Sequence, residues 1–217
     1  MRVHCFPGAA MNTHTSSLHE ERLDEVASRV RQSGCTRIVD LGCGTGSLMR
    51  RLLLDSRYSR IHGLEQCGMS LRHAREMLAE VAPDDERLTL QQGSWLDPGL
   101  GLTGFDGAVM VETIEHVDPG RLSGLQRAIF ETLQPDWLLV TTPNAEFNPL
   151  FDLAPGEFRD PDHRFEWPRN RFREWAASMA RRTGYAVRIG GIGEADPELG
   201  PPTQIATFTR IRDDARG

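Results

Sequence analysis

The sequence predicts an α/β fold, with a mostly parallel sheet, helices on both faces and an antiparallel strand near the C-terminus. Two observations predict it. Short apolar runs that suit buried strands alternate with segments of helical period over most of the chain, which is typical of parallel strands joined by helices. The last two strand-like runs are joined instead by a segment rich in Gly and Pro.

Apolar side chains at helical spacing predict the first helix, over residues 18–31. Leu23, Val26, Ala27 and Val30 would share one face of it, and Gly34 follows as a stop. Beyond this helix, strands are expected at residues 37–41, 60–64, 88–91, 105–111 and 137–141, and helices at residues 47–54, 70–81 and 121–133.

The regular alternation ends after the fifth strand. Residues 143–161 are rich in Pro, Asn, Asp and Phe and have no clear period, which indicates a long functional loop. A helix is expected from about residue 169 to 182, because Pro168 suits the start of a helix. Strands at residues 185–189 and 204–209 complete the chain.

Length and composition indicate one domain. A chain of 217 residues with 39% hydrophobic content can form one substantial core. We expect a flexible tail over residues 1–17 and the domain over residues 18–217. No run approaches 18 apolar residues, and the N-terminus lacks the apolar core of a signal peptide. The four cysteines form no CxxC pair, so we expect reduced thiols in a cytoplasmic protein.

Charge is unevenly distributed along the chain. The net charge of −6 argues against a general nucleic-acid binder. Residues 157–188 nevertheless contain eight arginines against five acidic residues, so this segment is locally basic. All 25 basic residues are Arg, which suits phosphate recognition but follows more simply from codon bias. Arg164 and Arg169 are the candidates for phosphate contacts, with a solvated face as the alternative.

A glycine-rich loop follows the first predicted strand. It reads Asp-x-Gly-x-Gly-x-Gly over residues 40–46 and lies between a strand and a helix, an arrangement that places a ligand at the carboxyl edge of a parallel sheet. A dinucleotide-binding loop would have its third glycine at position 47, which is Ser47. Glu65 ends the second strand, where its carboxylate can accept hydrogen bonds from ribose hydroxyls. A glycine-rich turn beside a surface Glu is the simpler alternative.

This spacing resembles motif I of the class I methyltransferases that use S-adenosylmethionine (SAM), whose fold is Rossmann-like. The resemblance implies that the loop and Glu65 bind SAM. It also places residues 93–97, which follow the third strand, where methyltransferases commonly contact the adenine. The cofactor-binding residues implied in this way are Asp40, Gly42, Gly44, Gly46, Glu65 and Ser94.

A second group of residues suits a divalent metal. If residues 112–116 form a helical turn, Glu112, Glu115 and His116 share one face of it, because they stand at positions i, i+3 and i+4. Two carboxylates and an imidazole suit a Mg- or Mn-type ion, and His163 could complete the set. Taken alone, such a pattern is more often a solvated helix face. Its place directly after the fourth strand, at the same sheet edge as the glycine loop, favours a site.

Three segments together resemble one family. They read Val-Glu-Thr-Ile-Glu-His-Val-Asp (residues 111–118), Thr-Thr-Pro-Asn-Ala-Glu-Phe-Asn (141–148) and Asp-His-Arg-Phe-Glu-Trp (162–167). They are similar to those of the RNA 3′-terminal 2′-O-methyltransferases of the HUA-enhancer type, over roughly residues 18–210. The resemblance implies four residues that are both metal ligands and catalytic: Glu112, Glu115, His116 and His163.

The family resemblance also carries expectations about cofactors and partners. It implies a monomeric, metal-dependent domain that transfers a methyl group from SAM to the terminal 2′-hydroxyl of an RNA with a free 2′,3′-diol. Mn²⁺ or Mg²⁺ would be the ion, and Mn²⁺ is favoured in vitro because it tolerates His nitrogen better. Bacterial members act in RNA repair, which implies a polynucleotide kinase-phosphatase partner.

Two other functions stay open. A small-molecule O-methyltransferase of the ubiquinone-biosynthesis type also shows Glu-x-x-Glu-His-Val after the fourth strand, but does not share the segment 162–167. A non-catalytic RNA-binding module with a methyltransferase fold is the other. Among supporting residues, Phe147 and Asn148 are candidates for the nucleotide pocket, whereas Trp167, Phe172 and Trp175 are expected in the core.

Overall fold

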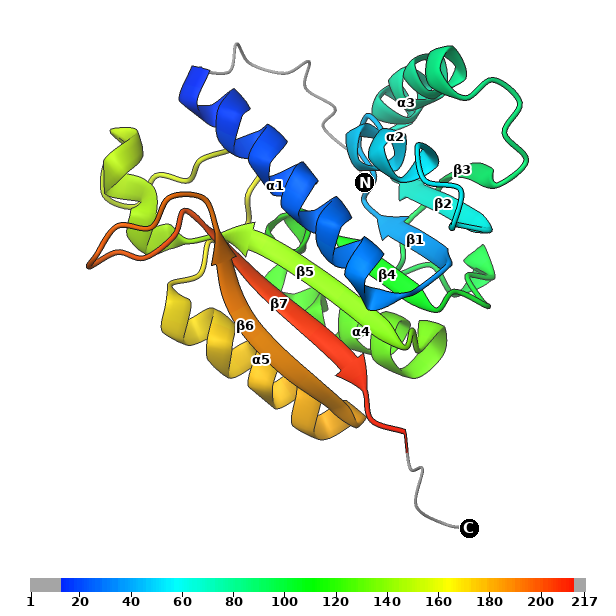
Figure 1. Ribbon diagram of the computed structural model, residues 1–217. Helices are drawn as coiled ribbons and strands as arrows, with labels where there is room; N and C mark the ends of the chain where they lie inside the picture. The colour runs from blue at the N-terminus through cyan, green and yellow to red at the C-terminus, as the bar shows by residue number, and fades with distance from the viewer. Residues whose placement is uncertain (1–12, 213–217) are drawn as a thin grey trace.

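The computed structural model describes residues 13–212. This part of the chain contains one seven-stranded sheet (Figure 1). The strand order is β3-β2-β1-β4-β5-β7-β6. The strands β1 to β5 are parallel, and β7 runs antiparallel to both β5 and β6, so the predicted fold class is confirmed. The strands are β1 (Arg37–Leu41), β2 (Arg60–Glu65), β3 (Leu88–Gln92), β4 (Gly107–Met110), β5 (Trp137–Pro143), β6 (Tyr185–Ile192) and β7 (Thr203–Arg210).

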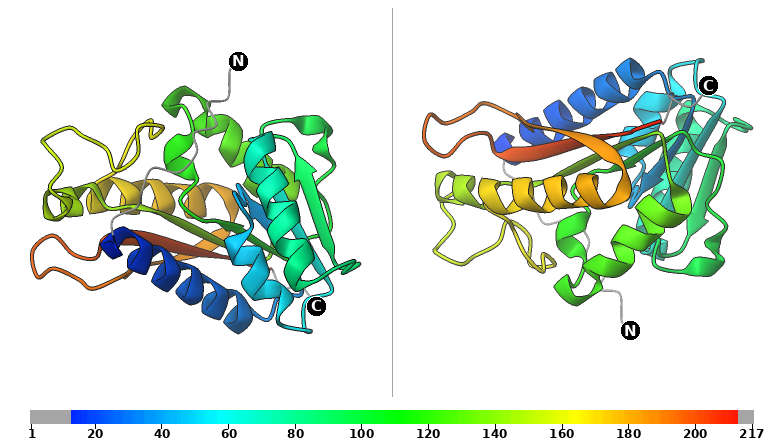
Figure 2. Two further views of the ribbon diagram at one scale, coloured as in Figure 1. Left: turned by 90° about the horizontal axis from the view of Figure 1, so that it is seen from above. Right: turned by 90° about the horizontal axis from the view of Figure 1, so that it is seen from below.

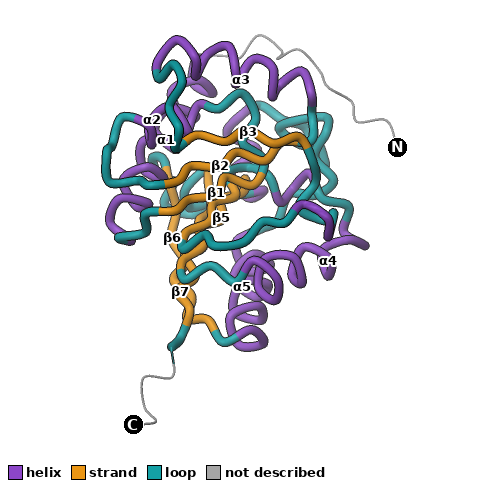
Figure 3. Tube along the Cα trace, turned by 90° about the vertical axis from the view of Figure 1, so that its right-hand side faces the viewer, coloured by secondary structure: helices purple, strands orange, loops and turns teal. Residues whose placement is uncertain are grey.

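Helices cover both faces of the sheet. Figure 2 shows α1 on one side of β6 and β7 and α5 on the other, and Figure 3 shows the strands as one twisted stack from β3 to β7. The helices are α1 (Thr13–Ser33), α2 (Ser47–Leu53), α3 (Gly68–Val81), α4 (Leu122–Gln126), which continues as the π-helical η4 (Arg127–Leu133), and α5 (Arg169–Thr183). Short 3-10 turns are η1 (Pro98–Leu100), η2 (Ile114–His116), η3 (Pro119–Arg121) and η5 (Ala145–Phe151).

The two faces of the sheet bury two hydrophobic cores. Side chains alternate along a strand, so Ile38 of β1 joins the core under α1, α2 and α3, whereas Val39 and Leu41 join the core under α4 and α5. Every residue of β5 is buried, as a strand covered on both faces requires. The arrangement fixes the carboxyl ends of β1, β2, β4 and β5 along one edge.

Several sequence predictions need correction. The first helix begins at Thr13 rather than Leu18, so residues 13–17 are helical, and residues 1–12 of the expected tail lie outside the described part. The expected loop over 143–161 contains the turn η5. Cys35 and Cys43 have free, buried thiols. Cys67 is disulfide-bonded, so the expectation of reduced thiols is wrong there. None of the described helices is long and apolar enough to cross a membrane.

Candidate active site

The glycine loop is held tightly to the end of β2. The backbone N–H groups of Gly42 and Cys43 both donate to the carbonyl oxygen of Leu64, at 2.8 and 3.0 Å. Gly42, Gly44 and Gly46 all have positive φ, between 54° and 94°, a conformation in which glycine is not strained. The local sequence therefore folds into a tight loop at the sheet edge, in which Gly42 and Gly44 are half-buried.

The carboxylate of Glu65 accepts hydrogen bonds from the glycine loop and from the start of the following helix. One of its carboxylate oxygens accepts from the backbone N–H of Gly44 at 2.9 Å, and the other accepts from the N–H of Cys67 at 2.7 Å. A Cβ added at Gly44 would meet nothing within 4 Å, so open space lies beside this part of the loop. The structure thus brings the predicted loop and acid together, with open space beside Gly44.

Gly42 has a different role from Gly44. A Cβ at Gly42 would lie 2.6 Å from the side chain of Thr113, so only glycine allows this contact. Thr113 belongs to the segment that carries the candidate metal ligands. The cofactor loop and that segment are consequently packed against each other.

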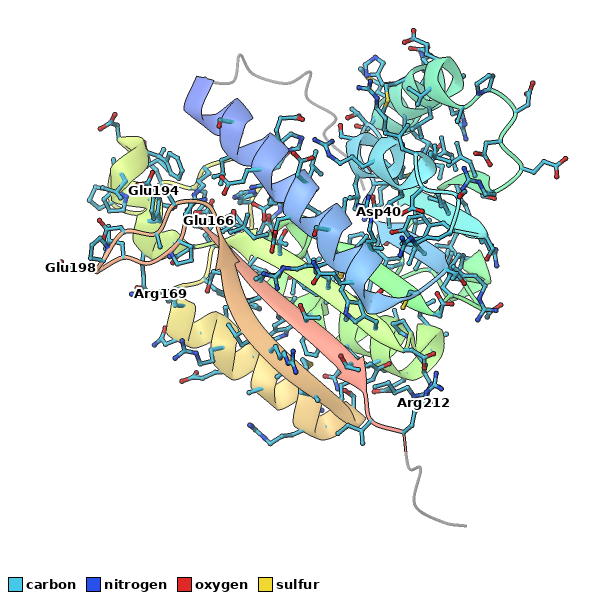
Figure 4. The ribbon with its side chains drawn as sticks, viewed as in Figure 1. Asp40, Glu166, Arg169, Glu194, Glu198 and Arg212 are labelled. Atoms are coloured by element: carbon cyan, nitrogen blue, oxygen red, sulfur yellow. The ribbon has the colours of Figure 1, made fainter. Side chains whose placement is uncertain are left out.

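Asp40 lies buried at the end of β1 (Figure 4). Its Oδ1 has no hydrogen-bond partner among the described residues. Burial, and then the nearby charge of Glu65, raise the pKa of Asp40 to about 7. A positively charged ligand would favour its ionised form, and SAM carries both an ammonium and a sulfonium group.

Ser94 closes its own turn after β3. Its hydroxyl accepts from the N–H of Leu96 at 3.3 Å, and its carbonyl accepts from the N–H of Asp97 at 2.8 Å. The neighbouring N–H of Gly93 donates to the backbone oxygen of Glu65, which keeps this turn beside the acid. A contact between Ser94 and the adenine stays a prediction.

Three of the four predicted metal ligands come together. Ligand atoms of Glu115, His116 and His163 all lie within 4.8 Å of one another. The backbone N–H of Arg164 donates to the carbonyl of Glu115 at 2.8 Å, which ties the two segments together. The His116 and His163 rings are 4.8 Å apart and nearly perpendicular. His116 is exposed at the edge of the group, whereas Glu115 is fully buried.

The carboxylate of Glu115 is incompletely satisfied. Its Oε2 accepts from the hydroxyl of Thr142 at 3.0 Å, but its buried Oε1 has no hydrogen-bond partner within residues 13–212 and lies 4.0 Å from Nε2 of His163. Burial, and then the charge of Glu112, raise the pKa of Glu115. A buried carboxylate oxygen is costly without a partner. A divalent ion between this oxygen and the two imidazoles would supply one, so the donor set fits such an ion.

Glu166 orients His163. Its carboxylate lies 2.5 Å from Nδ1 of His163 and also accepts from Asn148 and from the N–H of Arg159. Burial alone would raise the pKa of Glu166, but these hydrogen bonds outweigh it and lower the pKa. An ionised Glu166 accepts the proton on Nδ1 and leaves Nε2 of His163 as an acceptor facing Glu115.

Glu112 does not join the other three ligands, because residues 112–116 do not form one regular helical turn. Glu112 has φ of +48°, and the 3-10 turn η2 begins only at Ile114. Thr141 accepts from the N–H of Glu112 and donates to its Oε1, at 3.0 and 2.8 Å. The other carboxylate oxygen of Glu112, Oε2, pairs with the guanidinium of Arg22 in α1 at 3.2 Å. The expected helical turn over residues 112–116 is therefore wrong, whereas a role of Glu112 as a ligand stays a prediction.

The two phosphate candidates differ in the structure. Arg169 pairs with Glu146 at 2.7 Å and donates to the carbonyl of Glu198, so its guanidinium is already neutralised and bonded within the protein. Arg169 and Glu198 are labelled in Figure 4. Arg164 is exposed, and its side chain makes no ion pair among the described residues. Arg164 is therefore the better candidate for an external anion.

Other supporting residues have structural contacts. Asn148 is buried and bonds Glu166 and Arg159, which places it in the network behind His163 rather than in an open pocket. Phe147 contacts the ring of Phe151. Of the rings expected in the core, Trp167 and Phe172 lie there, and Trp175 is half-buried against it.

Three residues of the site are not among the sequence candidates. Arg22 stands four residues before Val26 on the apolar stripe of α1, and a charge on such a stripe is a signal that could have revealed it. Glu166 lies three residues after His163, within the same motif. Thr142 lies within the quoted segment 141–148, but its contact with Glu115 depends on how β5 packs against the ligand segment, which local sequence does not show.

Comparisons with known proteins agree with this geometry. A family model described as a methyltransferase domain matches residues 38–136. The glycine loop, the acid that ends β2 and the antiparallel β7 define a class I SAM-dependent methyltransferase. Within this class the chain belongs to the Hen1 family. It is 35% identical to the methyltransferase domain of bacterial CtHen1-CN, with a TM-score of 0.79, over 88% of this chain and 99% of that one.

Two further relatives extend the comparison. The small RNA 2′-O-methyltransferase of Xenopus tropicalis is 35% identical over 203 residues, which are 89% of this chain and 55% of the relative. The chain therefore spans about half the length of that protein. A chain of the Pnkp1/Rnl/Hen1 RNA repair complex shares the fold at 22% identity, with a TM-score of 0.67, over 90% of this chain and 42% of its own length.

Proposed function

We propose that this chain transfers a methyl group from SAM to the 2′-hydroxyl of the 3′-terminal nucleotide of an RNA, with the help of a divalent cation. One observation carries the proposal. The buried Oε1 of Glu115 lacks a partner and faces two imidazoles, at the same sheet edge as the glycine loop. The relatives named as small RNA 2′-O-methyltransferases support RNA as the substrate class.

The residues have separate tasks in this proposal. The glycine loop, Glu65 and Asp40 bind SAM. Glu115, His116 and His163 hold the cation, and Glu112 is a fourth ligand that becomes available when its side chain leaves Arg22. A cation bound there would supply a Lewis acid that lowers the pKa of a hydroxyl held beside it. Because the contacts read sugar and phosphate rather than base edges, the enzyme should accept many sequences.

The proposal also covers the oligomeric state, the partner and the cellular location of the domain. We infer that the domain acts as a monomer in RNA repair, beside a polynucleotide kinase-phosphatase that prepares the RNA end. The likeness to a chain of the Pnkp1/Rnl/Hen1 complex supports this partner only through a shared fold. The cytoplasmic location stays a prediction, which fractionation of the source cells tests.

One assay tests the reaction directly. The protein is incubated with labelled SAM, Mn²⁺ and a short RNA that ends in a free 2′,3′-diol, and the same RNA with a 3′-phosphate or a terminal 2′-deoxyribose serves as the control. We expect label only in the first RNA, at its terminal ribose. Label at an internal ribose, or equal label in the 3′-phosphorylated RNA, would contradict the proposal.

Ligand variants test the cation. Alanine at Glu115, His116 or His163 should each nearly abolish methyl transfer, with SAM affinity largely intact. A double variant should be little worse than the worse single variant, because residues that hold one ion act as a unit. Glu174→Ala, an exposed change on α5, is the control. Full activity of wild type in chelated buffer would leave a metal-free methyltransferase and move a small-molecule acceptor ahead of RNA.

A further inference from the structure

Arg22 is a buried cation directed at the ligand group from α1. It lies on the stripe of α1 that also buries Val26 and Val30, and its side chain is only 11% exposed. One guanidinium nitrogen, Nη1, lies 3.2 Å from Glu112 and donates to the hydroxyl of Thr203 at 3.3 Å. Its Nε has no partner among the described residues. In the part of the chain that the structure describes, Glu112 is thus the one carboxylate that forms an ion pair with Arg22.

The Glu112 backbone is held in place, so its side chain alone can change partners. Its N–H donates to the hydroxyl of Thr141 and its Oε1 accepts from that hydroxyl, so Oε2, which pairs with Arg22, is the oxygen that can change partners. Glu112 also lies close to the ligand group, since the adjacent residues Thr141 and Thr142 of β5 donate their hydroxyls to Glu112 and to Glu115. Two cations can therefore bind the Glu112 carboxylate: the guanidinium of Arg22, which now pairs with it, and any ion held beside Glu115.

We propose that Arg22 competes with the divalent ion for Glu112, so that the free protein presents three ligands and the fourth is recruited only when Arg22 releases it. The inference rests on the proposed cation site. It makes Arg22 a positioning residue that keeps the site weak in the free protein. RNA phosphates bring negative charge to the same edge and so favour the release.

The contacts of Arg22 make this exchange feasible. After release, the guanidinium keeps the hydroxyl of Thr203 and the ring of His19, which lies 3.3 Å from Nη2. A cation left buried without any partner would be costly, and these two contacts avoid that state. The exchange also links α1 to the ligand group, although the two are separated by about ninety positions in the sequence.

Calorimetric titration with Mn²⁺, in the absence of RNA, tests the competition. Arg22→Met removes the charge and keeps an unbranched side chain of similar reach. Its affinity for Mn²⁺ should rise by roughly tenfold, within the usual coupling of residues in contact. The same substitution in a Glu112→Gln background should change nothing, because the released ligand is gone. Arg29→Met is the matched control: it removes an arginine of α1 that pairs with Glu25 and lies outside the site.

The single variant Glu112→Gln gives a second readout that needs no change at Arg22. Its affinity for Mn²⁺ should stay within about threefold of wild type, since Glu112 is already occupied, whereas Glu115→Gln should lose affinity by more than tenfold.

Four outcomes would overturn the inference. An unchanged affinity in Arg22→Met, or an increase that is equal in both backgrounds, would reduce Arg22 to a nearby charge. A loss in Glu112→Gln as large as that in Glu115→Gln would show that Glu112 binds the ion in wild type without competition. Absence of Mn²⁺ binding in every variant and in wild type would remove the cation site itself, and with it the metal part of the proposed function.

Discussion

At the scale of the residue, the contact of Glu166 with Nδ1 of His163 leaves Nε2 as the atom that could bind the proposed ion. Replacing this carboxylate by the amide in Glu166→Gln keeps the size but removes the charge that accepts from Nδ1. We expect the affinity for Mn²⁺ to fall by roughly tenfold to a hundredfold, as is usual when the partner of a ligating histidine is lost. Calorimetry measures it.

The control for Glu166 is Glu157→Gln. Glu157 is exposed and accepts from the N–H of Ala154, without contact to His163. It should bind Mn²⁺ like wild type. A Glu166→Gln variant with unchanged Mn²⁺ affinity and a normal melting temperature would show that the hydrogen bond is structural only.

Asp40 gives a second prediction at this scale, about stability and pH. Its folded pKa of about 7 lies above its ordinary value of 3.8, so the folded state holds a proton that the unfolded state has lost. The resulting stability is present below pH 4 and disappears as pH rises through 7, by on the order of 4 kcal/mol in total. Asp40→Asn removes this dependence, so its advantage over wild type without cofactor should grow by roughly 3 kcal/mol from pH 5 to pH 8.

Urea unfolding at the two pH values measures this difference, and SAM titration of the same variant accompanies it. We expect Asp40→Asn to be the more stable protein at pH 8 and the weaker binder of SAM, because the carboxylate that answers the cofactor's positive charge is gone. Equal pH dependence of wild type and variant would mean that Asp40 is ionised throughout.

At the scale of the element, a glycine of the cofactor loop can be compared with a glycine outside the loop that has a similar conformation. Gly44 and Gly34 both have positive φ, and a Cβ at either would meet nothing within 4 Å. Ala at either position should therefore cost about 1 kcal/mol of stability through backbone strain. Only Gly44→Ala should lose SAM affinity, by tenfold or more, because its open space is the space proposed for the cofactor. Chemical unfolding and SAM titration of both variants would separate strain from binding, and equal SAM affinity would remove Gly44 from the cofactor site.

The elements also show what local sequence can predict. The bounds of β1 match the prediction, and those of α2, β2 and β3 lie within one residue of it, because buried apolar runs and turn residues are local signals. The turn at residues 112–116 was wrong because the i, i+3, i+4 rule assumes a regular helix, whereas Thr141, a distant residue in β5, sets the backbone of Glu112. The same reason hid Thr142 and Arg22, whose contacts arise only when α1, β5 and the ligand segment pack together.

At the scale of the whole molecule, the proposed function requires that a chain of net charge −6 bind RNA. Only some arginines of the locally basic segment 157–188 are available to bind phosphate. Arg169 is paired with Glu146, and Arg159 donates to backbone carbonyls. Arg164 is exposed beside the ligand group and is free of ion pairs among the described residues. The prediction at this scale is therefore that arginines close in sequence contribute unequally to RNA binding.

Arg164→Ala and Arg169→Ala should separate these contributions. We expect Arg164→Ala to weaken RNA binding about threefold to tenfold and to reduce the slope of log affinity against log salt by about one, because one phosphate contact is lost. Arg169→Ala should instead lower the melting temperature, since it leaves Glu146 without its partner, and should change the salt slope less. Fluorescence anisotropy with a labelled RNA at several salt concentrations measures the slopes. A larger change of slope in Arg169→Ala than in Arg164→Ala would mean that RNA displaces Glu146 and that the path of the strand follows the start of α5.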